Sequence, residues 1–237
     1  MDRLETRNLE RLQQQVIRCK RCPRLVRWRG KVARDKTRRF AQWEYWGRPN
    51  PSFGDPKAQV LLIGLAPAAH GGNRTGRMFT GDRSGDWLYR TLYEFEFANQ
   101  PTSVSRDDGL RLTNCYITAT CRCAPPQNKL LPAEIRNCRP FLLKELELLR
   151  NVRVIIGLGK VGFDSAVNAF QELGWASFSK RPRFAHGSEY KLNETVTLLG
   201  SFHPSQQNTF TGRLTRSMFD AIFKRAQTLL LSQQTST

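Results

Sequence analysis

The chain has 237 residues, which is enough for one α/β domain with a full hydrophobic core. Its 38 Lys and Arg outnumber 20 Asp and Glu, and the formal net charge of +18 indicates a polyanionic partner, most simply nucleic acid. An anionic membrane surface is the competing partner, but no apolar stretch is long enough to cross a bilayer and the polar N-terminus is unlike a signal peptide. We therefore expect a soluble, cytoplasmic protein.

Residues 1–50 form a basic arm. They hold fifteen Lys or Arg against five Asp or Glu, so about a fifth of the chain supplies +10 of the net charge. The spacing of Leu9, Leu12 and Val16 predicts an amphipathic helix over residues 2–18. The aromatic residues that follow can either pack the arm onto the main domain, which we favour, or stack on nucleic-acid bases; they are Trp28, Phe40, Trp43, Tyr45 and Trp46.

Residues 51–231 alternate between predicted strands and predicted helices. Such alternation is typical of a parallel sheet flanked by helices. We therefore predict an α/β fold, a single-domain α/β/α sandwich with a central four-stranded parallel sheet. The predicted strands span residues 59–66, 110–120, 152–158 and 195–202, and the predicted helices span 85–98, 133–149, 159–170 and 213–230. Residues 174–195 show no clear pattern, and 232–237 form a polar tail.

The first predicted strand leads into a loop rich in Gly, Asn and Arg. This loop delivers Asp82 just before a helical pattern begins, and Arg74, Arg77 and Arg83 surround that acid with positive charge. Open α/β sheets bind ligands at the carboxyl ends of their strands, so the loop suits an anionic ligand. It matches neither common phosphate-binding motif. The alternative is a plain connection with solvated arginines.

The six cysteines do not indicate a disulfide framework, because we expect an intracellular chain. Cys19 and Cys22 form a short pair in the arm, and Cys123 and Cys138 lie on either side of a turn. Two thiolates from one loop and two from distant segments can complete a four-coordinate metal site. Zinc and an iron–sulfur cluster both remain open on spacing alone. Cys115 and Cys121, in or beside the second strand, are expected to be buried apolar residues.

Three long motifs in order resemble the signature regions of the type-5 uracil-DNA glycosylases. They are GLAPAAHGGNRTGRMFTGDRSG at 64–85, RCAPPQNKLLP at 122–132 and SFHPSQQNTFTGRL at 201–214, and the arm segment CKRCPRLVRWR at 19–29 is similar as well. The resemblance implies a four-stranded parallel sheet between helices, removal of deaminated bases from DNA, and a [4Fe–4S] cluster that anchors the arm. It implies these cluster ligands: Cys19, Cys22, Cys123 and Cys138.

Two departures from the related type-4 enzymes bear on specificity. Leu65 stands where those enzymes carry an acid or amide, and Ala119 stands where they carry an Asn near the end of the second strand. Both changes remove groups that would read uracil or assist catalysis. The resemblance therefore implies a wider pocket that accepts hypoxanthine and xanthine beside uracil.

Cleavage of a glycosidic bond builds positive charge on the sugar and negative charge on the departing base, so the site needs an anion or an oriented water and a hydrogen-bond donor. The resemblance assigns these tasks to Asp82, His203 and Asn128. Phe79 can stack on an extruded base, and we expect Ala68, His70 and Asn73 to line the base pocket. Predicted DNA contacts are Arg74, Arg77, Ser205 and Arg213, with the loop at 204–213 as a wedge. Each catalytic residue has a structural alternative: Asp82 bracing the loop, His203 in a turn before Pro204, and Asn128 in a turn after two prolines.

The resulting hypothesis is a monofunctional DNA glycosylase, because no lysine stands out as a Schiff-base nucleophile. We expect a monomer that acts on DNA without a nucleotide cofactor. The main rival is a non-catalytic iron–sulfur nucleic-acid-binding module, which would share the charge and the cysteines but would need neither Asp82 nor His203. A nucleotide-dependent transferase is disfavoured because the loop lacks a P-loop lysine.

Overall fold

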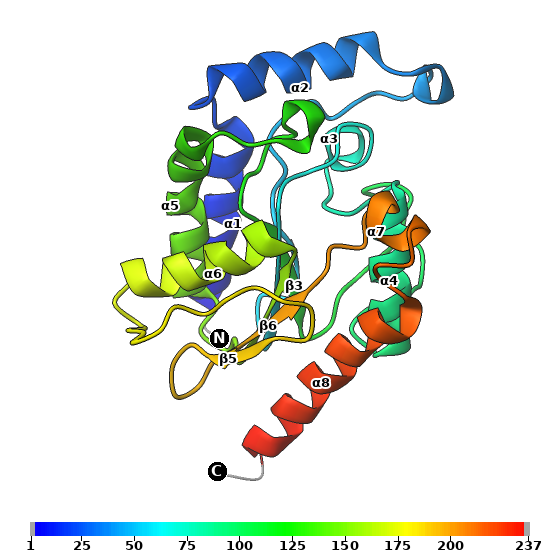
Figure 1. Ribbon diagram of the computed structural model, residues 1–237. Helices are drawn as coiled ribbons and strands as arrows, with labels where there is room; N and C mark the ends of the chain where they lie inside the picture. Colours follow the sequence, from blue (N-terminus) through cyan, green and yellow to red (C-terminus); the bar gives the residue numbers. More distant parts are fainter. Residues whose placement is uncertain (1–2, 235–237) are drawn as a thin grey trace.

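A mixed sheet of six strands forms the centre of the computed structural model, which describes residues 3–234 (Figure 1). The strand order is β1-β3-β2-β4-β6-β5. β2 pairs in parallel with both β3 and β4, and β4 pairs in parallel with β6, whereas β1 and β5 are antiparallel edge strands. The strands are β1 (Phe53–Gly54), β2 (Val60–Gly64), β3 (Cys115–Ala119), β4 (Val154–Leu158), β5 (Glu189–Lys191) and β6 (Thr197–Ser201).

The sheet therefore has two more strands than the four expected. Every residue of β2, β3, β4 and β6 is buried, which is why each reads as a continuous apolar run. β1 has only two residues, and β5 alternates between exposed and half-buried side chains within the stretch that showed no pattern. Short edge strands bury little apolar surface, so they leave no periodic signal in the sequence.

Helices cover both faces of the sheet (Figure 1). Leu88 and Phe219, from α4 and α8, pack on one face, and Leu142 and Phe163, from α5 and α6, pack on the other. The helices are α1 (Arg3–Arg18), α2 (Pro23–Asp35), α3 (Gly72–Thr75), α4 (Arg83–Glu94), α5 (Pro132–Leu148), α6 (Lys160–Glu172), α7 (Gln206–Phe210) and α8 (Arg216–Gln234), with 3₁₀ turns η1 (Arg38–Phe40) and η2 (Pro126–Asn128). α8 includes the first residues of the expected tail, and 235–237 lie outside the described residues.

The arm packs against the main domain through both of its helices. Val16 of α1 packs with Phe141 of α5. In α2, the Arg24 guanidinium donates to both carboxylate oxygens of Glu134 at 2.8 and 2.7 Å, so that the helix is joined to the start of α5. This paired contact is the geometry in which an arginine–carboxylate bond is strongest.

The aromatic residues after α2 pack on the main domain, as favoured from the sequence. The guanidinium of Arg74 lies 3.9 Å from the Phe40 ring centroid and 4.1 Å from that of Trp43. The Tyr45 hydroxyl lies 3.0 Å from Nδ1 of His70. Cation–π stacking of this kind stabilises the segment against the loop that follows β2.

Bilayer-spanning helices were not expected. Within residues 3–234, no helix combines the length and the apolar composition needed to cross a membrane.

Candidate active site and cysteine cavity

A cleft with about 330 Å³ of empty space opens at the carboxyl ends of the parallel strands. Gly64 ends β2, Ala119 ends β3, and His203 follows β6 by two residues. This is the edge at which open α/β sheets bind ligands. We call it the strand-end cleft, and its lining consists of Gly64, Ala66, Pro67, Ala68, Met78, Phe79, Asp82, Ser84, Ala119 and His203.

Asp82 lies in the cleft and is also the N-cap of α4. Its Oδ1 accepts a hydrogen bond from the Gly85 N–H at 3.0 Å. The other oxygen lies against Gly71, where a Cβ would collide with it. Burial raises the pKa of Asp82, against the lowering effect of the Gly85 N–H. The Ser84 N–H also hydrogen-bonds the carboxylate, so the structural alternative for Asp82 is real, although the side chain still lines the cleft.

His203 faces the same cleft with a neutral imidazole ring. Burial lowers the pKa of His203 to about 4, so its imidazole is uncharged near neutral pH and one ring N–H is a donor. Its backbone is held in place, because its carbonyl accepts from Asn208 Nδ2 at 2.8 Å and from the Ser205 N–H at 2.7 Å. A neutral imidazole N–H can stabilise negative charge on an oxygen without transferring its proton.

Phe79 stacks on His203, with ring centroids 5.7 Å apart and planes 28° apart. It adopts a left-handed backbone, with φ of 53°, which is uncommon for a residue other than glycine. Space for this conformation comes from Gly85, where a Cβ would collide with the Phe79 carbonyl oxygen. The ring and the imidazole together form one wall of the cleft.

Two of the predicted pocket residues, His70 and Asn73, and the predicted catalytic residue Asn128 do not line the cleft. His70 bonds Tyr45, and Asn73 is fully buried with its Nδ2 donating to the Arg29 carbonyl at 3.3 Å. Asn128 is exposed in η2, with φ of 55°, and does not line the cleft. Left-handed backbone is a conformation that Asn tolerates well, which fits the turn role weighed from the sequence.

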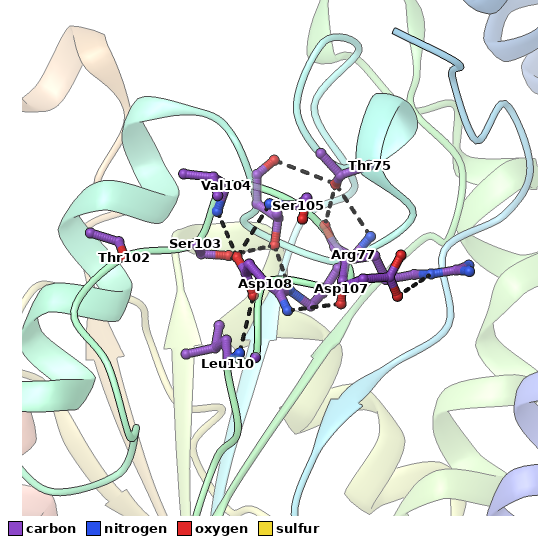
Figure 2. Close-up of polar contacts among 12 residues, drawn as sticks. Thr75, Arg77, Thr102, Ser103, Val104, Ser105, Asp107, Asp108 and Leu110 are labelled. Atoms are coloured by element: carbon purple, nitrogen blue, oxygen red, sulfur yellow. Dashed lines mark hydrogen bonds and ion pairs between the residues drawn. The ribbon is translucent and has the colours of Figure 1, made fainter.

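The structure corrects the expected phosphate contact at Arg77 (Figure 2). Its side chain is only 3% exposed, and Nη2 donates to both oxygens of Asp108 at 2.8 and 2.7 Å. Nε donates to Thr80 and Nη2 also reaches Ser103, so the guanidinium is enclosed by its own partners. Arg77 therefore neutralises Asp108 and stabilises the loop, and its charge is not available to a DNA phosphate.

Arg74 is also buried, which corrects the expectation of a DNA contact there. Nε donates to the His70 carbonyl at 2.7 Å and Nη2 to the Gly81 carbonyl at 2.9 Å, while its faces carry Phe40 and Trp43.

Ser205 and Arg213 lie on the segment after His203. Ser205 is the N-cap of α7, with its hydroxyl accepting from the Asn208 N–H, and Arg213 is exposed with its guanidinium 4.7 Å from the Phe202 ring centroid. The expected wedge loop thus contains a short helix. At its end Phe210 is 66% exposed and lies under the Arg83 guanidinium, a protruding aromatic that sequence reasoning did not single out.

A second cavity, with about 350 Å³ of empty space, is lined by cysteines from distant segments. Its thiols come from Cys19, Cys22, Cys121, Cys123 and Cys138. Cys115 and Cys121 are buried, as expected, but Cys121 also belongs to this cysteine cavity. Within the described residues no group of three or more His, Cys, Asp or Glu side chains is close enough to hold a metal ion, so the thiols surround a space instead of meeting at a point.

Hydrogen-bond donors point at the cysteine sulfurs. Arg29 Nη1 donates to Cys123 Sγ at 3.1 Å, and Asn137 Nδ2 lies 3.6 Å from Cys22 Sγ. A hydrogen bond with Cys121 lowers the pKa of Cys138, and the charge of the buried Arg122 lowers it further. Burial raises the pKa of Cys123 to about 12, against the lowering effect of Arg29. Arg122 thus favours the thiolate form of Cys138, the form of cysteine that binds metals, whereas burial outweighs Arg29 at Cys123.

The layered fold and the strand-end cleft agree with the family comparison. The family model of the Uracil DNA glycosylase superfamily matches residues 51–227. The chain is 51% identical over 212 residues to a type-5 uracil-DNA glycosylase of Mycobacterium bovis, covering 89% of this chain and 78% of that protein. It is 48% identical over 216 residues to one of Thermus thermophilus, covering 91% and 95%. The chain therefore belongs to the type-5 uracil-DNA glycosylases.

Several cleft residues were not proposed from the sequence as site residues, most of them because a small or apolar side chain signals no function. Gly64, Ala66 and Pro67 line the cleft together with Met78 and Ser84. Gly64 could have been found from its position alone, since it ends a buried parallel strand. Met78 offered no comparable signal.

Proposed function

We propose that the protein excises uracil from DNA by extruding the base and hydrolysing its N-glycosidic bond, which leaves an abasic site. Family membership supports this proposal, and the observation that carries it is the meeting of Asp82, His203 and Phe79 in one cleft at the strand ends. We propose further that it acts as a monomer without a nucleotide cofactor, on DNA in the cytoplasm.

Each of these three side chains suits one part of the reaction. The Asp82 carboxylate, when ionised, supplies the negative charge that a positive sugar requires and lies where it can orient a water in the cleft. The neutral His203 imidazole donates to a base oxygen as that oxygen gains charge. Phe79 offers an aromatic surface to the extruded base.

The lining of the cleft supports a broad choice of base. Only Asp82, Ser84 and His203 among its lining residues carry polar side chains, and Ala119 presents a methyl group where an amide could have read a base edge. Specific reading of a base needs positioned donors and acceptors. With few of these, the cleft suits uracil, hypoxanthine and xanthine alike.

The DNA-binding surface combines charge with a wedge. The arm carries a surplus of ten positive charges, and Arg213 is exposed beside the cleft segment. Phe210 protrudes at the end of α7, where insertion between bases would compensate for the unstacking of the extruded one. We propose that α7 and Phe210 enter the DNA while the arm holds phosphates.

We propose that the cysteine cavity holds a [4Fe–4S] cluster, which would join α2, the turn after β3 and α5 through iron–sulfur bonds. The donor set fits, because Cys19, Cys22, Cys123 and Cys138 surround a cavity that Arg29 and Asn137 supply with N–H donors. The purified protein should be brown and should lose its colour in Cys138→Ala. A colourless anaerobic preparation with stoichiometric zinc would contradict this assignment.

The deciding experiment incubates the protein with oligonucleotides that carry uracil, hypoxanthine or xanthine and then treats them with alkali. A glycosylase produces strand breaks at the modified position, because abasic sites are alkali-labile. A non-catalytic iron–sulfur binding module would bind the same DNA and leave every strand intact. The relative yields from the three bases test the breadth of the cleft.

A further inference from the structure

Buried polar atoms without partners occur in three segments: the arm, the turn of residues 121–123, which we call the cysteine turn, and the loop of residues 66–82, which we call the glycine loop. In the described part of the chain they are Trp28 Nε1, Asn50 Oδ1, Asn73 Oδ1, Arg74 Nη1 and Arg122 Nε. Every one belongs to the cysteine turn, to the glycine loop or to the arm segments that touch them. Such atoms are costly in a folded protein, so each of them calls for an explanation.

One connection between the cysteine cavity and the glycine loop runs through Arg29. Its guanidinium reaches the cysteine cavity, donating to Cys123 Sγ at 3.1 Å and to the Cys19 carbonyl at 3.3 Å. Its own carbonyl accepts from Nδ2 of the buried Asn73 at 3.3 Å, and the Asn73 N–H donates to the carbonyl of Ala68, which lines the strand-end cleft. A single residue thus touches a cysteine sulfur at one end and the glycine loop at the other.

A second connection runs through Asn50, whose side chain is fully buried. Its N–H donates at 2.7 Å to the carbonyl of Arg122, the residue between Cys121 and Cys123. Its Nδ2 donates at 3.0 Å to the carbonyl of Gly72, directly before Asn73. The two connections therefore start at neighbouring residues of the cysteine cavity, Arg122 and Cys123, and enter the glycine loop at neighbouring residues, Gly72 and Asn73.

We propose that Arg29 and Asn50 are positioning residues that couple the cysteine cavity to the strand-end cleft, so that a bound iron–sulfur cluster holds the glycine loop in its catalytic position. The proposal rests on the proposed function and cofactor. This coupling makes base excision sensitive to loss of the cluster, although no cysteine lines the cleft. Breaking a buried hydrogen bond costs about 1.4 kcal/mol, or about tenfold in a local equilibrium.

The arm has an anchor that does not depend on either connection. Arg24 joins α2 to Glu134 of α5, and Val16 packs with Phe141. Replacing Arg29 or Asn50 therefore leaves α1 and α2 attached to the domain, and the variants Arg29→Gln and Asn50→Ala test the coupling instead of the fold.

The test is amide hydrogen exchange of the full chain, with iron present and after its removal by a chelator. In the wild type, iron removal should speed exchange in residues 66–82 about tenfold while the core strands β2 and β4 stay protected. In the double variant Arg29→Gln/Asn50→Ala the glycine loop should exchange fast in both states, so that its dependence on iron disappears. Single-turnover excision should fall by a similar factor, while DNA affinity is unchanged.

Arg27→Gln is the matched control for exchange and iron retention, because it removes a guanidinium from the exposed face of the same helix. It should change neither quantity. The coupling is overturned if the double variant keeps the iron dependence, if iron removal leaves the wild-type loop unchanged, or if removal exposes the core strands equally. Wild-type protein that binds no iron also overturns it. If the protein holds iron but releases no base, the proposed function fails while the exchange data still test the coupling.

Discussion

Replacement of Asp82 by Asn separates the two roles that the structure gives this residue. The side chain caps α4 through Oδ1, which accepts the Gly85 N–H at 3.0 Å, and it also lines the strand-end cleft. Asn keeps an oxygen that can accept the same hydrogen bond, and it is as favourable as Asp at an N-cap. It removes the negative charge and the basic oxygen that a positive sugar requires.

The expected magnitudes differ sharply between the two roles. If Asp82 is catalytic, Asp82→Asn should lower the rate of the cleavage step roughly 10²- to 10⁴-fold. Its effect on stability should stay within about 1 kcal/mol, the usual value of a charge at a helix N-terminus. Asp82→Ala loses the cap as well, which costs about 0.5–2 kcal/mol and lowers Tm by about 2–4 °C for each kcal/mol in a protein of this size.

Single-turnover kinetics on uracil-containing duplex, combined with thermal unfolding, distinguish the roles. DNA binding by Asp82→Asn should persist or tighten slightly, because a negative charge near phosphates is lost. A loss of less than about tenfold in the cleavage step would refute the reasoning. The carboxylate would then be only a helix cap, and the catalytic group would have to be sought elsewhere in the cleft.

Three further predictions follow from the charges of the molecule. Changing the exposed Arg34 and Arg38 to Gln should reduce the slope of log K against log salt by about 0.9 for each phosphate that is no longer neutralised, and an unchanged slope would exclude both arginines from the DNA-binding surface. Because the pKa of His203 is lowered to about 4, its imidazole stays neutral until the pH falls toward that value, so His203 should contribute no midpoint to the cleavage rate near the ordinary histidine pKa of about 6.5. A midpoint that disappears in Asp82→Asn belongs to the carboxyl group, whose pKa burial raises. Arg77→Met removes the cationic partner of Asp108 but leaves three backbone N–H donors on its carboxylate, so urea unfolding should show a loss of about 1–3 kcal/mol without a change in the salt slope of DNA binding.

The parallel strands and the main helices were predictable because burial leaves a pattern. β2 and β4 are buried on both faces and read as apolar runs, and α5 begins at Pro132, which favours the first turn of a helix. The edge strands and α7 are too short or too exposed to leave such a pattern. Helix α2 was not predicted, because its many basic residues obscured the apolar face that carries Leu25 and Val32.

The site was predictable only where position along the chain decides position in space. Residues just after a parallel strand meet at one edge of the sheet, and for this reason His203 and Ala68 share a cleft as expected. Asp82 lies much farther along the loop and reaches the same cleft as the N-cap of α4. Loop membership alone carries no such rule. Asn73 and Asn128 sit in the right motifs, yet one is buried under α2 and the other is exposed in a turn.

The layered α/β fold, the surplus of positive charge and the residues at the strand ends follow from the amino-acid sequence, because they depend on local pattern and composition. Which charged side chains are free depends on the three-dimensional fold. Arg77 and Asp108 lie 31 residues apart, and only folding encloses them together and removes that arginine from the DNA-binding surface. It likewise brought Cys121 beside the other thiols, because contacts between distant segments depend on the path of the chain and not on residue type.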